Sequence, residues 1–235
     1  MSPIAGIDAD CCVADTWNVT VLALFDLDNT LLDRERAFRL WVDDFVASQE
    51  LGEGARTAIQ DADADGFRPR DEFFTELKGV LPLRDSLESL LADYDVSYPS
   101  RYRIDSETLV SIRRLRSEGY KVGVVTNGPP SQWAKFEAAG IEAEFDAVSI
   151  SSVVGSWKPD LAIFENAARQ CGLALDGWMV GDSPAADIAG GIKAGLRTIW
   201  MTRGPVWGED SYAPEFTAAS IPEAVEIILR ETSAS

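Results

Sequence analysis

The feature that most constrains the fold of this chain is a short apolar run that ends in two closely spaced carboxylates. The segment 19–26 reads VTVLALFD, and Leu27 and Asp28 follow it. Such a run of β-branched and aliphatic residues is typical of a strand buried on both faces of a parallel sheet. Ligands bind at the carboxyl ends of such strands, so we expect Asp26 and Asp28 to face a ligand site together. Two neighbouring carboxylates repel each other, and a bound cation or a shared proton relieves that repulsion.

The rest of the chain divides into a helical stretch and an alternating stretch. Residues 34–104 carry apolar side chains at helical spacing and show no strand pattern. From residue 105 onward, strand-like runs alternate with helical patterns, which indicates βαβ units and a parallel sheet. The predicted strands are 121–126, 145–150, 177–181 and 196–201, and the predicted helices are 130–139, 159–171, 184–194 and 222–230.

These patterns predict an α/β fold whose core is a Rossmann-like parallel sheet in three α/β/α layers, with a helical-bundle cap domain inserted after the first strand. The core comprises residues 19–33 and 105–235, and the cap comprises residues 34–104. Residues 1–18 lack any periodicity, so we expect an N-terminal arm there.

Charge and composition exclude several classes of function. The formal net charge is −18, which argues against a nucleic acid or an anionic membrane as partner. The chain has no histidine, so a histidine-based triad and a Cys/His zinc site are both excluded. Its three cysteines are sparse, and it shows neither a signal-peptide pattern nor a long apolar run. We therefore expect a cytoplasmic protein, either a monomer or a homodimer.

Polar or small residues follow other predicted strands or precede a helix: Thr126, Asn127, Gly128, Lys158, Asp182 and Asp187. The carboxyl ends of parallel strands lie at one edge of a sheet, so these residues are expected to meet there. Each has a simpler explanation when it is taken alone. Asn-Gly is a common turn pair, and Lys158 could simply precede a helix that begins at Pro159. Their joint occurrence favours a site.

Four short motifs follow one another along the chain, and they resemble the four ordered motifs of the haloacid dehalogenase (HAD) superfamily. The motifs are Asp26-x-Asp28-x-Thr30, Thr126-Asn127, Lys158-Pro159 and Gly181-Asp182-x4-Asp187. The helical insertion resembles the cap of its class I members. The resemblance implies an enzyme that hydrolyses phosphate monoesters through an aspartyl-phosphate intermediate and uses Mg²⁺.

The resemblance also implies a role for each motif residue. Asp26 would be the nucleophile and Asp28 the general acid and base. Thr126 and Lys158 would be catalytic and would hold the phosphoryl oxygens, helped by Asn127 and Gly128. The implied metal-binding residues are Asp26, Asp28 through its main-chain carbonyl, Asp182 and Asp187.

We expect the substrate to be a small phosphorylated metabolite, such as a sugar phosphate, a nucleotide or a phosphoglycolate-like molecule. Asp28 distinguishes the chain from the haloacid dehalogenases, which lack an acid at that position. A phosphomutase or other phosphotransferase of the same fold is an alternative, and so is a non-catalytic binding or regulatory protein. Phosphonate-cleaving relatives form a Schiff base with a cap lysine, but only Lys78 is available here and nothing else supports that role.

One segment of the predicted cap has a competing explanation. Residues 61–72 match the ligand spacing of an EF-hand calcium loop, with acids at Asp61, Asp63 and Asp65. Arg68 and Pro69 are poorly suited to such a loop, and no second loop is present to pair with it. The alternative is that Arg68 and Arg70 bind an anionic substrate, or that they only balance nearby surface acids.

Overall fold

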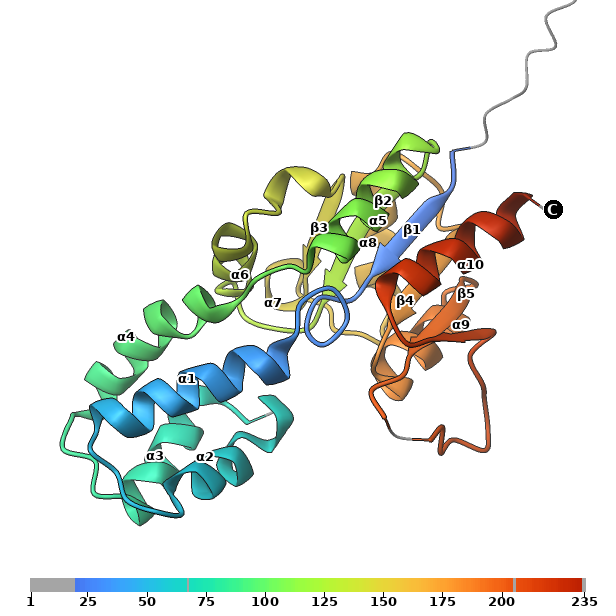
Figure 1. Ribbon diagram of the computed structural model, residues 1–235. Helices are drawn as coiled ribbons and strands as arrows, with labels where there is room; N and C mark the ends of the chain where they lie inside the picture. Colours follow the sequence, from blue (N-terminus) through green and yellow to red (C-terminus); the bar gives the residue numbers. More distant parts are fainter. Residues whose placement is uncertain (1–19, 67, 205, 234–235) are drawn as a thin grey trace, which may run out of the picture.

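The computed structural model describes residues 20–66, 68–204 and 206–233. Within these residues the chain forms a parallel sheet flanked by helices and a separate lobe of helices at one edge of the sheet (Figure 1). The predicted α/β fold is therefore confirmed. The predicted N-terminal arm, residues 1–18, lies outside the described residues. No helix in the described part of the chain is long and apolar enough to cross a membrane.

The sheet places the first strand in its middle. Its described strands are β1 (Leu22–Phe25), β2 (Lys121–Thr126), β3 (Ala147–Ile150), β4 (Gly177–Gly181), β5 (Arg197–Met201) and β6 (Phe216–Ala218). They are all parallel and lie in the order β3-β2-β1-β4-β5-β6. Because β1 lies between β2 and β4, the residues that follow these three strands are brought next to one another at one edge.

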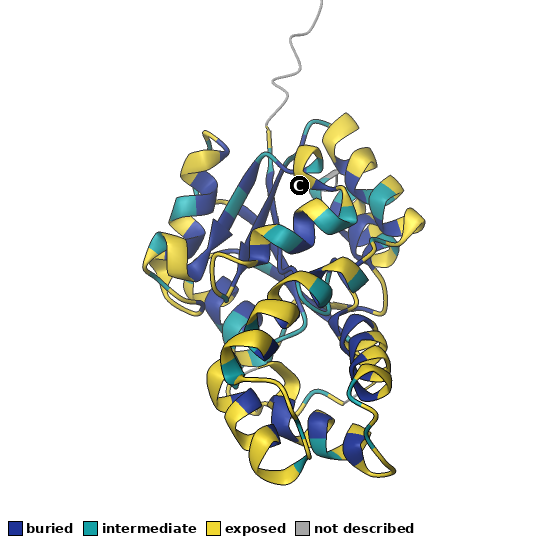
Figure 2. Ribbon diagram, turned by 90° about the vertical axis from the view of Figure 1, so that its left-hand side faces the viewer, coloured by how far each residue is buried: buried dark blue, intermediate teal, exposed yellow. Residues whose placement is uncertain are grey.

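Both faces of the sheet are covered by helices. The helices after the cap are α5 (Ser106–Ser117), α6 (Gln132–Ala139), α7 (Ser151–Val154), α8 (Leu161–Gln170), α9 (Ala189–Lys193) and α10 (Ile221–Ser233). Side chains of β1 alternate between the faces: Ala23 and Phe25 pack in the cluster that includes α5 and α10, whereas Leu22 and Leu24 pack in the cluster with α8. Figure 2 shows the strands buried between helices whose outer faces are exposed. This double coverage explains why the strands read as continuous apolar runs.

The second lobe consists of helices from the segment between β1 and α5. They are α1 (Arg34–Ser48), α2 (Ala55–Asp63), η1 (Ala64–Gly66), α3 (Arg70–Val80), α4 (Leu87–Ser97) and η2 (Pro99–Arg101). The Asp33 carboxylate caps α1 by accepting a hydrogen bond of 2.8 Å from the Arg36 amide. The lobe has its own aromatic core, in which the ring of Trp41 lies 4.9 Å from the rings of both Phe45 and Tyr94. We call α1–α4 with η1 and η2 the cap.

Several predicted elements differ from the observed ones by a few residues at their ends. The strand predicted over 145–150 begins at Ala147; just before it, the Asp146 amide donates to the Val122 carbonyl and the Asp146 carboxylate accepts from the Val122 amide. The helix predicted over 184–194 begins as a π-helix, η4 (Pro184–Ile188), before α9. Its wider turn lets the Asp187 carboxylate fold back onto the Ser183 amide, at 2.9 Å.

Candidate active site

Asp26 lies at the carboxyl end of β1, buried beside a lysine from a distant part of the chain. Its carboxylate Oδ1 is 2.5 Å from the Lys158 Nζ, and the same Nζ is 2.7 Å from Asp187 Oδ1. All three side chains are buried. Gly181 makes the position of Asp187 possible, since a Cβ at Gly181 would lie 2.3 Å from the Asp187 carboxylate. One buried lysine thus faces two carboxylates.

Three carboxylates converge at this edge of the sheet. One oxygen each of Asp26, Asp182 and Asp187 lies within 4.8 Å of the others. Burial raises the pKa of Asp26 to about 8, with Asp187 and Asp182 adding to the rise and Lys158 opposing it. Burial and Asp187 likewise raise the pKa of Asp182 to about 6, although Arg203 opposes the change. The cluster therefore holds more negative charge than Lys158 alone compensates.

This donor set fits a magnesium ion. Magnesium prefers hard oxygen ligands and is usually held by one or two carboxylates together with water. Asp26 and Asp182 can supply such carboxylates, while Asp187 already accepts hydrogen bonds from Lys158 and from the Ser183 amide. Asp187 is thus better suited to orient the cluster than to bind an ion directly.

Asp28 faces away from this cluster, toward α6. Both of its oxygens contact the Lys135 Nζ, at 2.6 and 2.7 Å, and Gln132 Nε2 donates to Oδ2 at 3.0 Å. The Tyr102 hydroxyl donates to Oδ1 at 3.1 Å. Burial alone would raise the pKa of Asp28, but the charge and hydrogen bonds of Lys135 and Gln132 hold it below its usual range. The carboxylate of Asp28 is thus ionised and firmly oriented, and it does not join the metal cluster; the predicted metal contact of its main-chain carbonyl stays a prediction.

Residues at the end of β2 hold other residues of the site in position. The Asn127 side chain forms two hydrogen bonds with the main chain of Lys158: Nδ2 donates to its carbonyl at 3.0 Å, and Oδ1 accepts from its amide at 2.8 Å. The Gly128 amide donates to Ser151 Oγ at 2.9 Å. The Gly128 amide, one of the backbone N–H groups expected to help bind phosphate, therefore already has a partner. Thr126 is buried, and its hydroxyl accepts from Gln132 Nε2 at 2.9 Å.

A cavity of about 150 Å³ separates this edge of the sheet from the cap. Its core side includes Asp28, Asn127, Gly128, Gln132 and Lys135. Its cap side includes Arg34, Gly66, Arg70, Tyr94 and Tyr98. The cavity therefore joins the carboxylate of Asp28 to a wall that carries two guanidinium groups.

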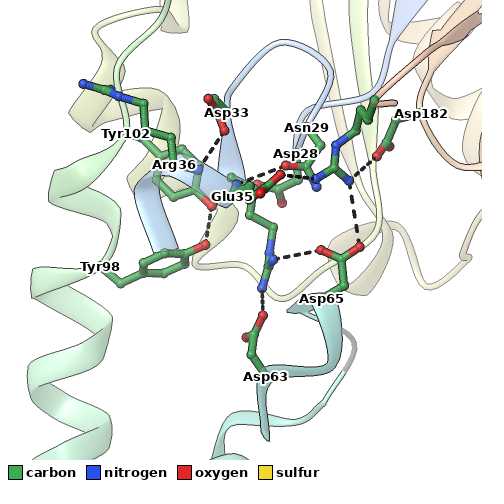
Figure 3. A network of polar contacts seen from close by, with 12 residues as sticks. Asp28, Asn29, Asp33, Glu35, Arg36, Asp63, Asp65, Tyr98, Tyr102 and Asp182 are labelled. Atoms are coloured by element: carbon green, nitrogen blue, oxygen red, sulfur yellow. Dashed lines mark hydrogen bonds and ion pairs between the residues drawn. The ribbon is translucent and has the colours of Figure 1, made fainter. Parts of the chain in front are cut away.

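The two cap arginines share one buried carboxylate. Asp63 Oδ2 is 2.5 Å from Arg34 Nη2, and Asp63 Oδ1 is 2.7 Å from Arg70 Nη1. Arg34 also contacts Asp65 at 3.3 Å. Figure 3 shows the carboxylates of Asp63 and Asp65 on this part of the cap. A third arginine, Arg203 of the core, lies 3.2 Å from Asp182 and 3.8 Å from Asp65, so it connects the carboxylate cluster to the cap.

This arrangement argues against the calcium loop, and it places only one of the two predicted substrate-binding arginines at the cavity. Asp61 and Asp63 lie within α2, and both oxygens of Asp63 are already paired with arginines. Arg70 lines the cavity as expected, but Arg68 does not, because its guanidinium pairs with Glu76 on the exposed face of α3.

Sequence reasoning missed four residues of the site: Arg34, Tyr102, Gln132 and Lys135. Gln132 and Lys135 could have been predicted from the sequence. They are three residues apart in a helix that follows Asn127-Gly128, so they share one face of that helix. Arg34 and Tyr102 flank the cap at its two junctions with the core, and no local pattern distinguishes them.

Proteins of known function resemble this chain over part of its length. Pyrimidine 5'-nucleotidase YjjG of Escherichia coli (strain K12) is 35% identical over 113 residues, which are 47% of this chain and 50% of that protein. The (S)-2-haloacid dehalogenase of Pseudomonas sp. (strain YL) is 31% identical over 131 residues, or 55% of this chain and 56% of that protein. The matched segment thus spans about half the length of these curated relatives.

Similarity extends to solved structures and to a family model. The crystal structure of a HAD phosphatase from Thermococcus onnurineus superposes with a TM-score of 0.65 at 26% identity, covering 88% of this chain and 97% of that one. The model of the haloacid dehalogenase-like hydrolase family matches residues 21–195, which include all four motifs described above. The expected family is confirmed: the chain belongs to the haloacid dehalogenase-like hydrolases.

Proposed function

We propose that the chain is a magnesium-dependent phosphatase that hydrolyses a small phosphorylated metabolite through an aspartyl-phosphate on Asp26. The observation that carries this proposal is the placement of Asp26 beside Lys158 and two further carboxylates, with Asp28 close by in sequence and facing the cavity. A nucleophile next to a cation, with a second carboxylate for proton transfer, is what displacement at phosphorus requires.

In the first step, an Asp26 oxygen attacks phosphorus, and the bond from phosphorus to the ester oxygen breaks. Lys158 faces Asp26 at 2.5 Å and offers positive charge to the phosphoryl oxygens. When bound, magnesium would be held by Asp26 and Asp182 and would supply further positive charge at the same place. Asn127 keeps Lys158 in position through its two main-chain hydrogen bonds.

The leaving oxygen needs a proton, and the hydrogen-bonded pair formed by Asp28 and Lys135 can supply one. Asp28 is ionised, and burial lowers the pKa of Lys135 while Asp28 opposes that change. A proton on the Lys135 Nζ can therefore pass through Asp28 to the leaving alkoxide. In the second step, Asp28 accepts a proton from the water that attacks the aspartyl-phosphate, which returns the pair to its starting state.

Two other activities remain as alternatives. A haloacid dehalogenase is one because a relative has that activity, but the ionised Asp28 and its three hydrogen-bond partners have no evident use in displacing a halide. A phosphomutase is the other, and it would need to hold a second substrate in the cavity of about 150 Å³. The first would release halide from a 2-haloacid, and the second would transfer phosphate without releasing it.

Phosphate release from p-nitrophenyl phosphate and from a panel of sugar phosphates, nucleotides and phosphorylated acids tests the proposal. The wild type is expected to release phosphate with Mg²⁺ and to stop when EDTA is added. Asp26→Asn keeps the shape of the side chain but removes the nucleophile, so it is the matched control. Wild-type rates no higher than those of Asp26→Asn across the whole panel would refute the proposal.

A further inference from the structure

The cavity between the cap and the sheet is small and suits a small leaving group. Its volume is about 150 Å³, and a protein cavity of roughly that size accommodates benzene, a molecule with six heavy atoms. Asp28, the proposed proton donor, lines this cavity. The part of the substrate beyond the ester oxygen would enter this cavity, whose volume suits a group of about six non-hydrogen atoms. A nucleoside is several times larger.

Three cationic side chains line the cavity, Arg34, Arg70 and Lys135, against two carboxylates, Asp28 and the exposed Asp95. Lys135 is matched by Asp28, with which it makes both of its close contacts. Arg34 and Arg70, by contrast, share the single buried carboxylate of Asp63. Asp65 also contacts Arg34, but it is largely exposed and lies near a further arginine of the core. One buried positive charge on the cap wall thus lacks a matching buried anion.

Several donors of these guanidinium groups are also unused. Nη1 of Arg70 donates hydrogen bonds to Asp63 and to the Tyr94 hydroxyl, at 2.7 and 3.4 Å. Nη1 of Arg34 donates to Asp65, and its Nη2 donates to Asp63. Among the described residues, Nε and Nη2 of Arg70 and Nε of Arg34 have no hydrogen-bond partner. A planar anion in the cavity would satisfy them.

The two guanidinium groups are held rigidly. Arg70 lies over the rings of Phe73 and Tyr94, at 4.9 and 5.5 Å from their centroids. Arg34 lies against Gly66, where a Cβ would come within 2.5 Å of its Nε. Because both groups are fixed before a ligand arrives, little side-chain entropy is lost when an anion binds.

From the size, the charge and the free donors of the cavity, we infer that the leaving group is a small carboxylic acid, so that the substrates are phosphorylated hydroxy acids of two or three carbon atoms. This inference rests on the proposed phosphatase function. Arg34 and Arg70 would bind the carboxylate and thereby determine specificity, since the fork of donors on a guanidinium matches the two oxygens of a carboxylate.

Paired substrates that differ only in the acid group test the inference. In each pair a carboxylate is replaced by a hydroxymethyl group: 2-phosphoglycolate is compared with 2-hydroxyethyl phosphate, and 3-phosphoglycerate with glycerol 3-phosphate. We expect the wild type to show a kcat/KM at least about tenfold higher for each acid. Arg34→Gln and Arg70→Gln should abolish this preference by raising KM for the acids much more than KM for the esters without the acid group.

Arg68→Gln is the matched control, because Arg68 lies on the same cap segment but pairs with Glu76 outside the cavity. It should keep the wild-type preference. Arg34→Lys and Arg70→Lys retain the positive charge but lose the paired donors of the guanidinium group. They replace the glutamine variants if those fail to fold. They should keep only part of the preference.

The outcomes separate this inference from the proposed function. Equal kcat/KM for acid and neutral esters, or faster hydrolysis of nucleoside monophosphates, would overturn the inference while leaving the phosphatase intact. An unchanged preference in folded Arg34→Gln and Arg70→Gln would overturn the roles of these two residues. No phosphate release above Asp26→Asn from any substrate would instead refute the phosphatase itself.

Discussion

Replacing Asp63 with asparagine should strongly destabilise the protein. The Asp63 side chain is only 3% exposed and is the carboxylate that Arg34 and Arg70, themselves 9% and 22% exposed, have in common. Asparagine keeps the shape but removes the charge, so it leaves two guanidinium groups close together without their shared anion. Removing one partner of a buried ion pair typically costs 3–5 kcal/mol, and we expect a loss of about 3–5 kcal/mol in the free energy of unfolding.

The measurement is urea denaturation followed by circular dichroism, in the presence of EDTA. Asp43→Asn is the matched control in the same cap, because Asp43 pairs with Arg56 where both side chains are about half exposed. That pair should contribute no more than about 1 kcal/mol. A further change, Arg34→Met in the Asp63→Asn background, should recover part of the loss, since it removes one of the two unpaired cations.

Two results would refute this reasoning. A loss below about 1 kcal/mol in Asp63→Asn would mean that the arginines do not depend on this carboxylate. Stabilisation of the wild type by calcium that disappears in Asp63→Asn would instead restore the calcium-loop interpretation of residues 61–72, in which Asp63 is a ligand.

Three further predictions concern the site and the cap. Because the pKa of Asp26 is raised to about 8, Mg²⁺ binding at pH 7 should release about one proton, and it should become tighter as the pH rises toward 8. Calorimetry in buffers of different ionisation enthalpy measures the number of protons released. Binding without proton release would contradict the prediction. Lys135→Met removes the cation that lowers the pKa of Asp28, so the acidic limb of the pH–rate profile should move to higher pH; an unmoved limb contradicts the assignment. Gly66→Ala and Gly54→Ala both place alanine at φ near +90°, but only Gly66 lies against a guanidinium. Thermal unfolding should therefore show a larger loss for Gly66→Ala, by about 1 kcal/mol or more, and equal losses would show that the close contact carries no cost.

The sequence alone was sufficient for the strands that carry the main residues of the site. The predicted strands 121–126 and 177–181 coincide with β2 and β4, because a strand covered on both faces has no polar position that blurs its limits. Asp26, Lys158, Asp182 and Asp187 meet because parallel strands end at one edge, a rule that needs no side-chain detail.

The partners of Asp28 could not be predicted in the same way. Tyr102 and Lys135 contact it across 74 and 107 residues of sequence, and which helix face meets it depends on how α6 and the cap pack. Arg34 and Asp63 likewise meet only because α1 and α2 fold together in the cap. A spacing rule that ignores tertiary packing would place Asp63 in a calcium loop, because the same acids occur at the same intervals.

The chain passes between the sheet and the cap through two neighbouring segments, and this has a mechanical consequence. Residues 29–33 lead into α1 and residues 103–105 lead back to α5, and both segments line one cavity at the junction. A rotation of the cap about these segments would leave every hydrogen bond of the sheet in place. It would break only side-chain contacts, such as those of Arg203 with Asp65 and of Tyr102 with Asp28. Opening of the cap would therefore be opposed by these polar contacts and by apolar side chains that pack continuously from the cap into the core, so that single substitutions at the junction can change how far the cap opens.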